Sequence, residues 1–275
     1  MNRTELTAAI HAKNSFLCVG LDSDISKIPP HLFSFTDPVY EFNRQIIDAT
    51  KDFCVAYKIN TAFYESCGTQ GWESLEKTLH YIPKDIFTIA DAKRGDIGNT
   101  AQQYAKTFFE TYPFDAVTLS PYMGEDSIRP FLEYKEKWAI LLGLTSNAGA
   151  KDFEFLQTQS GGKVYEEVIA KCASWGTPDN MMFVIGATRA EMLTDIRHII
   201  PNHYLLVPGV GAQGGSLEKT FEYGANGEVG LLVNSSRDII FADAGKRFNK
   251  EARSKAHQLQ KEMAGLMSKK QALSY

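Results

Sequence analysis

The chain has 275 residues, 44% of them hydrophobic and 23% charged, which suits one large α/β domain with a sizeable core. Its 29 basic and 33 acidic residues leave a formal net charge of −4, without the basic excess typical of proteins that bind nucleic acids or anionic membranes. The longest wholly apolar runs have seven residues. A bilayer span needs about 20, so we expect no membrane passage.

The N-terminal segment, MNRTELTAAIHAKN, places Glu5 and Lys13 where a secretory signal needs an unbroken apolar core, so we expect a cytoplasmic protein. No C-x-x-C spacing occurs, and we expect buried thiols instead of disulfides at the cysteines, which are Cys18, Cys54, Cys67 and Cys172. The histidines lack the H-x-x-x-H and H-E-x-x-H spacings that offer two metal ligands from one helix face. We therefore expect no histidine-built metal site.

Short β-branched or aromatic runs alternate with longer helix-period segments along the whole chain, as βαβ units require. Eight runs are predicted as strands, over residues 16–22, 55–60, 87–93, 116–122, 138–144, 181–187, 204–209 and 230–236. Eight such units fit a closed (β/α)8 TIM barrel better than an open Rossmann sheet. With no linker or low-complexity segment to divide the chain, we predict a single barrel domain over residues 1–275.

Helices are predicted between the strands. One runs from Asp37 to Phe53, with Asp37 as N-cap and Pro38 at the first helical position, and another from Thr100 to Tyr112. Near the C-terminus an apolar stripe indicates an amphipathic helix that packs on the outside of the barrel or contacts another subunit; it consists of Ala252, Ala256, Leu259, Met263 and Leu266.

Polar residues fall consistently at or just after the predicted strand ends, where the active sites of such barrels lie. They are Asp22, Lys58, Asp91, Lys93, Ser120, Ser146 and Arg237. This distribution predicts one active site, built from several strand ends.

The densest group is DAKRGDIGNT, residues 91–100. Because strand side chains alternate between faces, Asp91 and Lys93 are expected on the same face, with Asp96 turning back after Gly95. Lys58 is expected to enter the same space from the neighbouring strand. A rim salt-bridge network is the alternative interpretation, but buried ion networks carry desolvation costs that stability alone seldom justifies. The two lysines and two aspartates sum to zero charge, so the set can stay ionised.

A glycine-rich segment, PGVGAQGG, follows the seventh predicted strand at residues 208–215 and contains a G-x-G-x-x-G match. The dinucleotide fingerprint also needs an acidic residue ending the next strand, whereas Glu228 precedes that strand. Loops after strands seven and eight of a barrel commonly bind phosphate, and Arg237 can add a charged grip. We therefore expect a phosphate site here, which binds a sugar phosphate or a mononucleotide. The alternative is that the segment is a plain glycine-rich turn and that Arg237 is a surface arginine.

These blocks resemble the orotidine 5'-phosphate decarboxylase family, and most closely its longer bacterial branch. DAKRGDIGNT resembles the active-site motif of the family. The strand-end blocks CVGLDSD, AYKINTAFYE, TLSPYMG, GLTSNAGA, PGVGAQGG and NSSRDI follow in the order of the family. The resemblance implies a cofactor-independent lyase that decarboxylates orotidine 5'-phosphate to UMP in pyrimidine biosynthesis. The segment from Asn147 to Gly162 is longer than in the short branch.

The resemblance also implies roles for individual residues. Lys93 is the general acid that protonates carbon 6 of the pyrimidine, and Asp91 crowds the substrate carboxylate. Contacts to the ribose hydroxyls fall to Asp22 and Lys58. Ser146 reads the pyrimidine ring.

Across a subunit boundary, Asp96 and Thr100 are expected to reach the partner's site, which implies a homodimer with shared active sites. The phosphate is expected in the glycine-rich loop and at Arg237. The expected loop residues are Pro208, Gly209, Gly211 and Gln213.

Three alternatives remain open from the sequence. One is a related barrel enzyme that decarboxylates or condenses keto-sugar phosphates with magnesium. Another is a class I aldolase with Lys93 or Lys58 as the Schiff base, which flanking aspartates disfavour because they favour a protonated lysine. The third is a non-catalytic nucleotide sensor that keeps the pocket.

Overall fold

The computed structural model describes residues 1–186, 190–209 and 215–273. The chain forms two compact units. Unit 1 comprises residues 1–3 and 93–233, and unit 2 comprises residues 4–92 together with the chain from 234 onward.

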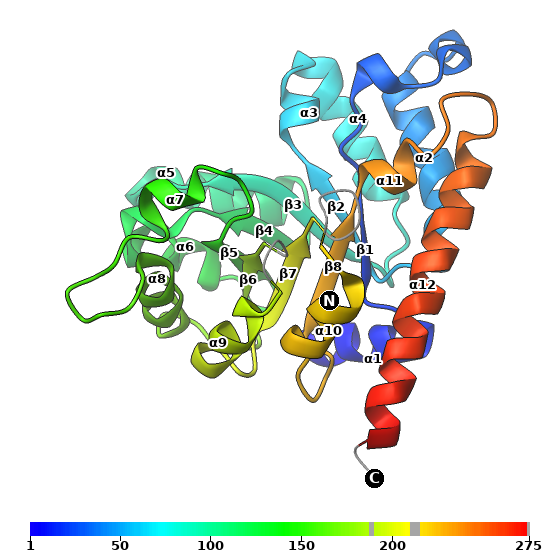
Figure 1. The fold of residues 1–275 in the computed structure, drawn as a ribbon. Coiled ribbons are helices and arrows are strands. Elements are labelled where there is room, and N and C mark those ends of the chain that lie inside the picture. The colour runs from blue at the N-terminus through cyan, green and yellow to red at the C-terminus, as the bar shows by residue number, and fades with distance from the viewer. Residues whose placement is uncertain (187–189, 210–214, 274–275) are drawn as a thin grey trace. The chain divides into compact units, whose positions relative to one another are not determined.

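The sheet is a closed barrel whose strands, β1 to β8, follow one another in chain order (Figure 1). The strands are Leu17–Gly20, Ala56–Asn60, Phe87–Arg94, Ala116–Leu119, Trp138–Leu144, Met181–Ile185, Tyr204–Pro208 and Leu231–Ser235. Pairing is parallel from β1 to β3 and from β4 to β7. The predicted (β/α)8 barrel and its eight strands are confirmed.

Burial explains why these runs form strands. Every residue of β1, β4, β6 and β8 is buried, including Cys18, Val19 and Met182. Parallel strands that are covered on both faces read as continuous apolar runs instead of alternating ones, and this is the pattern that the sequence shows. The polar residues of the strands concentrate at the carboxyl ends of the strands. The predicted site therefore lies at that end of the apolar core.

In unit 2 the helices are α1 (Arg3–Lys13), α2 (Pro38–Thr50), α3 (Ala62–Glu65), α4 (Gly68–Tyr81), α11 (Arg237–Ile240) and α12 (Phe248–Leu273). Asp37 caps α2 as predicted, its carboxylate accepting a hydrogen bond from the backbone N–H of Tyr40 at 3.0 Å. Pro38 occupies the first turn, where a missing N–H costs nothing.

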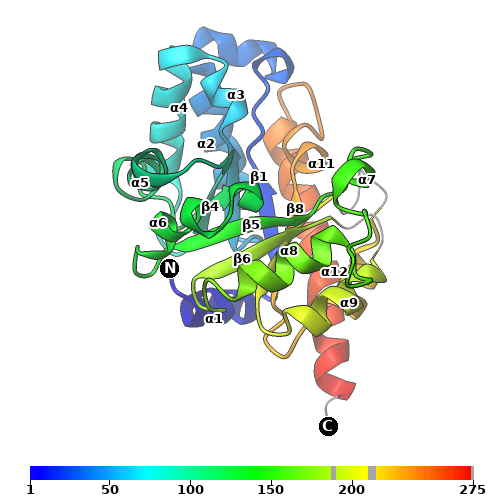
Figure 2. The ribbon, with the colours of Figure 1, turned by 90° about the vertical axis from the view of Figure 1, so that its left-hand side faces the viewer.

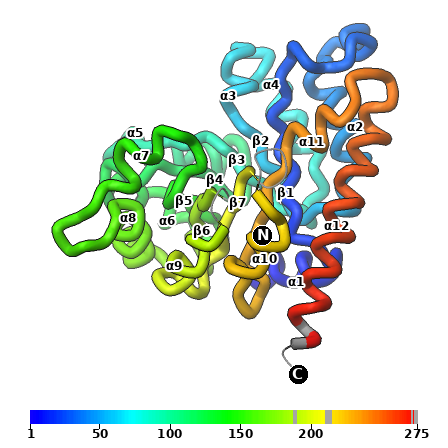
Figure 3. Tube along the Cα trace, viewed as in Figure 1, coloured from blue at the N-terminus to red at the C-terminus, as the bar shows by residue number. Residues whose placement is uncertain are grey.

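Helix α12 runs alongside α2, as the tube in Figure 3 shows. Its buried residues Ala252, Ala256 and Met263 belong to the stripe predicted from the sequence. The prediction was only partly right further along, because Leu259 and Leu266 are half-buried and Met267 takes the inner position. The inner face of the helix is therefore packed by small residues and methionines.

Unit 1 contains α5 (Gly98–Lys106), α6 (Arg129–Leu132), α7 (Ala150–Phe153), α8 (Val164–Ala173), α9 (Met192–Ile199) and α10 (Leu217–Gly224). Helix α8 covers β5 on its outer side (Figure 2). The helix predicted from Thr100 to Tyr112 begins two residues earlier, and after Lys106 it widens into a π-helical turn over Thr107–Thr111.

A half-buried arginine links the amino-terminal ends of β7 and β8 in unit 1. The Arg197 guanidinium donates to the carbonyl oxygens of Gly224 at 2.6 Å, His203 at 2.6 Å and Gly230 at 2.9 Å. Burial, and then the positive charge of Arg3, lower the pKa of Arg197 to about 10. At neutral pH it remains charged, and we refer to this arrangement as the Arg197 staple.

Two sequence expectations concern the rest of the described chain. All four cysteines are free thiols. Cys18, Cys54 and Cys172 are buried, as expected, whereas Cys67 is only half-buried. Within the described ranges no helix combines the length and apolar character that crossing a bilayer requires.

Candidate active site

At the carboxyl ends of β1, β2 and β3 in unit 2, a lysine lies between two aspartates. The Lys58 Nζ is 2.8 Å from the Asp91 Oδ2 and 3.2 Å from the Asp22 Oδ1. The Lys58 side chain is only 6% exposed, so this ion pair is formed largely away from water. The expected approach of Lys58 to Asp91 is observed.

Opposing effects act on the Lys58 ammonium. Burial alone lowers the pKa of this lysine, but the charges of Asp91 and Asp22 outweigh burial and hold the pKa above its ordinary value. Lys58 is therefore a permanent cation at physiological pH. A lysine in this state is unsuited to Schiff-base formation, which needs the neutral amine.

Behind Asp22 lies a buried hydrogen-bond network that sequence reasoning missed. The Tyr64 hydroxyl donates to the Leu21 carbonyl oxygen at 3.1 Å and accepts from the Asn43 side-chain amide at 2.9 Å. Ser23 donates to the Asn43 Oδ1 at 2.5 Å. The network holds the chain on both sides of Asp22. Its signal in the sequence was Asn43, a polar residue on the apolar face of α2.

Strand β8 ends in unit 2 with Asn234 and Ser235, and Arg237 follows two residues later. Arg237 is exposed at the first position of α11. The Oδ1 of Asn234, a residue only 7% exposed, has no hydrogen-bond partner among the described residues. A buried acceptor of this kind is available to a ligand hydroxyl. Asn234 is not among the residues predicted for the site.

In unit 1 the chain leaves β3 through an unusual backbone geometry at Lys93. Its φ is +46°, in the left-handed region that costs a non-glycine residue free energy and that concentrates at functional sites. The Lys93 N–H donates to the Thr118 Oγ1 at 2.9 Å, and Thr118 is itself buried. The alternation assumes an extended backbone, from which Lys93 departs, so a shared face for Asp91 and Lys93 stays a prediction. The Lys93 side chain is exposed.

The two residues expected at a subunit boundary, Asp96 and Thr100, lie shortly after Lys93 in the chain. Asp96 is half-buried, and its carboxylate accepts a hydrogen bond from the Ile97 backbone N–H at 2.8 Å. Thr100 is exposed on α5. Ile97, between them, exposes 50% of its surface.

Ser146 follows β5 in unit 1 and lines a hollow of about 210 Å³. Gly186, which follows β6, also lines this hollow. A Cβ at Gly186 would lie 2.8 Å from the Ser146 backbone nitrogen, so only glycine allows this approach. The strand ends of β5 and β6 therefore meet at Ser146.

Pro208, the last residue of β7, is half-buried, and Gly209 after it has a φ of +88°. Gly209 accepts a hydrogen bond from the Gly215 N–H at 3.3 Å, which brings the two described ends of the loop together. Gly211 and Gln213 lie outside the described residues. In unit 2 the structure thus brings Asp22, Lys58 and Asp91 together, and the roles of all the predicted residues stay predictions.

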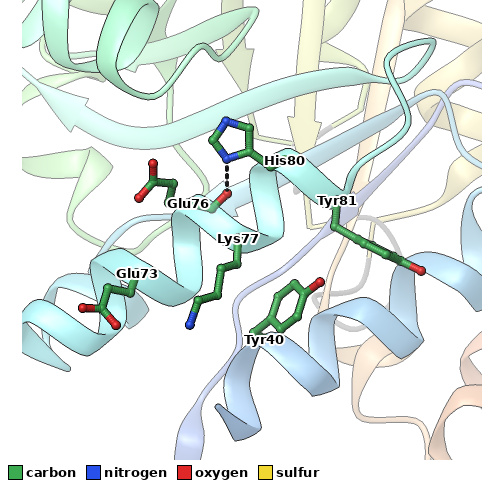
Figure 4. Close-up of a pocket in the computed structure, with 6 residues that line it drawn as sticks. All are labelled: Tyr40, Glu73, Glu76, Lys77, His80 and Tyr81. Carbon is green, nitrogen blue, oxygen red and sulfur yellow. Dashed lines mark hydrogen bonds between the residues drawn. The ribbon is translucent and has the colours of Figure 1, made fainter. Parts of the chain in front are cut away.

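A different hollow lies in unit 2 between α2 and α4 (Figure 4). Tyr40 and Lys77 line it, and the His80 ring nitrogen is 2.9 Å from the carbonyl oxygen of Glu76. None of the residues predicted for the site lines this hollow, so we do not include it in the candidate active site.

Comparisons with known proteins agree over most of the chain. The family model described as orotidine 5'-phosphate decarboxylase / HUMPS family matches residues 15–252. An orotidine 5'-phosphate decarboxylase of Parabacteroides distasonis is 56% identical over 273 residues, which cover 98% of each chain. One from Bacteroides fragilis is 54% identical over 96% of this chain and 97% of its own. Among solved structures, Leishmania donovani OMP decarboxylase has a TM-score of 0.79 and 33% identity, covering 94% of this chain and 99% of that one.

Proposed function

Because this chain belongs to the orotidine 5'-phosphate decarboxylase / HUMPS family, we propose that it decarboxylates orotidine 5'-phosphate to UMP, with Lys93 as the general acid. The observation that carries the proposal is the identity of 54% or more to decarboxylases over nearly the whole chain. The end of β3 supports it, since Asp91 is buried and ion-paired there and the exposed Lys93 follows in a left-handed conformation held by Thr118. The barrel acts as one catalytic domain.

The reaction breaks the bond between carbon 6 and the carboxylate. The electron pair stays on carbon 6, CO2 leaves, and the resulting carbanion takes a proton from the Lys93 ammonium. Water then returns a proton to Lys93, whose side chain is exposed. A fixed ammonium stabilises the developing charge before it donates the proton, so one group provides both electrostatic and acid catalysis.

Asp91 contributes by repelling the substrate carboxylate more strongly than the transition state, since only differential interactions raise the rate. Two unit charges about 4 Å apart at an effective dielectric constant of ~20 interact by roughly 4 kcal/mol. Enzymes typically lower the barrier by ~8–23 kcal/mol, so this repulsion is one contribution among several. Binding energy from the distant phosphate supplies another part.

The remaining predicted residues bind the nucleotide. Asp22 and Lys58 contact the ribose hydroxyls, and Ser146 reads the pyrimidine ring. Support for the phosphate site comes from the exposed guanidinium of Arg237 and the left-handed turn at Gly209. The other phosphate-loop residues are Pro208, Gly211 and Gln213.

The active enzyme is a homodimer in which Asp96 and Thr100 complete the partner's site. The exposed apolar side chains around the ends of β3 and β4 in unit 1 support this assembly. Tyr122 is 94% exposed, and Ile97 and Met123 are about half exposed. Large apolar groups gathered on one surface are typical of protein interfaces.

Lys93→Ala tests the reaction. Decarboxylation, followed by the loss of orotidylate absorbance, should fall below detection, while UMP still binds within a few-fold of its normal affinity. The wild type should keep its activity in excess EDTA. Wild-type protein that acts only on a keto-sugar phosphate with magnesium, or a Lys93→Ala variant with near-normal turnover, would overturn the proposal.

Hybrid dimers test the shared site. Lys93→Ala and Asp96→Ala homodimers are each expected to be inactive, but a hybrid has one site with both wild-type residues. Random mixing at equal amounts should restore about a quarter of the wild-type activity, because half of the dimers are hybrids with one intact site each. Without any restoration in verified hybrids, both residues act within one chain.

A further inference from the structure

The segment that follows β5 supplies a carboxylate to the end of that strand. Glu154, directly after α7, accepts a hydrogen bond from the Thr145 backbone N–H at 2.8 Å through its Oε2. Its Oε1 lies 2.6 Å from the Thr145 Oγ1. The backbone N–H and the side-chain hydroxyl of Thr145, the residue directly before Ser146, therefore both contact one carboxylate.

Strand β6 restrains the same point from the other side. The Gly186 N–H donates to the Leu144 carbonyl oxygen at 2.8 Å, and the backbone of Gly186 lies against Ser146 without room for a Cβ. Ser146 thus follows a residue that is held by Glu154, and Ser146 itself packs closely against the backbone of Gly186. The hollow of about 210 Å³ lies directly beside it.

The segment closes on itself without this carboxylate. The Val164 N–H donates to the Leu156 carbonyl oxygen at 2.9 Å, and the Thr158 N–H donates to the Gly162 carbonyl oxygen at 2.8 Å. The Glu154 carbonyl oxygen accepts from the Tyr165 N–H at 3.0 Å. Since the backbone bonds already hold the segment together, the Glu154 side chain is left to act on the strand end.

We propose that Glu154 is a positioning residue that orients Ser146 toward the pyrimidine ring. The inference rests on the proposed function, in which Ser146 reads the ring. It gives the long segment from Asn147 to Gly162 a task in substrate recognition, because that segment carries the carboxylate into place. Small displacements of a positioned group cost an enzyme large factors in rate.

Glu154→Ala should lower kcat/KM for orotidine 5'-phosphate by about 10- to 100-fold. It should weaken UMP binding but leave the binding of ribose 5-phosphate, which has no ring, within about twofold. A collapsed loop or a generally destabilised fold would weaken both ligands. The matched control is Asp152→Ala, an exposed carboxylate of the same segment that should keep wild-type kinetics.

Glu154→Gln should recover most of the activity. Its amide oxygen can accept from the Thr145 N–H, and its NH2 can donate to the Thr145 hydroxyl, whose hydrogen then bonds the Asn147 Oδ1 at 2.6 Å. Charge is therefore unnecessary for positioning. An equally inactive glutamine variant would overturn the positioning role.

A double-variant cycle with Ser146→Ala completes the test. If Glu154 acts through Ser146, the double variant should be no slower than Ser146→Ala alone, and additive losses would overturn the inference. An active wild type with unchanged Glu154→Ala kinetics would overturn it too. Inactive wild-type protein would instead contradict the proposed function, so the two failures are distinguishable.

Discussion

The backbone nitrogen of Lys93 donates to the side-chain oxygen of Thr118 at 2.9 Å, and this bond accompanies a left-handed φ of +46° at Lys93. Strained backbone persists only where surrounding contacts hold it. Thr118 is buried on β4 and supplies such a contact. The position of the proposed general acid therefore depends on a hydroxyl from the neighbouring strand.

Thr118→Val is expected to lower kcat by about tenfold or more, with little change in KM, because Lys93 loses the acceptor that holds its backbone. Steady-state kinetics with orotidine 5'-phosphate measure this effect. Thr118→Ser, which keeps the hydroxyl, should remain near wild type. Equal activity in the valine and serine variants would contradict the role of the hydrogen bond.

Lys58→Met should destabilise the fold by about 3–5 kcal/mol in urea unfolding, because it removes the ammonium that pairs with the buried Asp91 carboxylate at 2.8 Å. Adding Asp91→Asn should recover much of the loss. Lys77→Met is the matched control. It breaks the pair with Asp37 at 3.1 Å, in which Lys77 is 50% exposed, and such surface pairs contribute about 1 kcal/mol or less. Similar losses in the two lysine variants would argue against a buried charge.

Arg237→Ala should weaken UMP binding by roughly 10- to 100-fold, as expected for lost hydrogen bonds to a charged group. Uridine, which has no phosphate, should bind the variant and the wild type alike. Arg247→Ala serves as the control, since Arg247 is 74% exposed and pairs with Glu251. Isothermal titration with both ligands separates the outcomes, and a matching loss for uridine would exclude a phosphate contact.

His203 should make the fold sensitive to acid. Burial, followed by the charges of Arg3 and Arg197, lowers the pKa of His203 from 6.5 to about 4. Between these two values the unfolded chain binds more protons than the folded chain, so stability falls as the pH falls. By pH 5 the loss from this residue reaches about 2 kcal/mol.

His203→Gln should remove that contribution, so the difference in unfolding free energy between wild type and variant should change by about this amount between pH 8 and pH 5. His80→Gln, at an exposed position, is the control substitution. Parallel pH profiles for wild type and His203→Gln would show that His203 does not titrate in this way.

Much of the fold was predictable because buried parallel strands leave long apolar runs in the sequence. Asp37 and Pro38 marked the start of α2 correctly, since capping chemistry is local. By contrast, the packing of α12 was not fully readable from periodicity. Met267 and Leu266 are adjacent and both apolar, and only the neighbouring helix decides which of them is buried.

The site was predictable where residues stand at strand ends, as with Lys58 and Asp91. The contacts that support those residues were not. The bond from Lys93 to Thr118 depends on a local departure from strand geometry, and the bond from Glu154 to Thr145 crosses a loop. Neither follows a period of two or 3.6 residues, so no pattern in the sequence signals it.

The Arg197 staple joins carbonyl groups from the start of β7, the end of α10 and the turn before β8. This edge of a barrel serves stability, whereas chemistry belongs to the opposite edge. Thermal stability and turnover are therefore separable in this chain. Substitutions near Arg197 can change the stability without changing the residues that carry out the reaction. A chimera that exchanges residues 192–230 with a relative must take Arg197 and the three residues whose carbonyl oxygens accept its hydrogen bonds from the same parent.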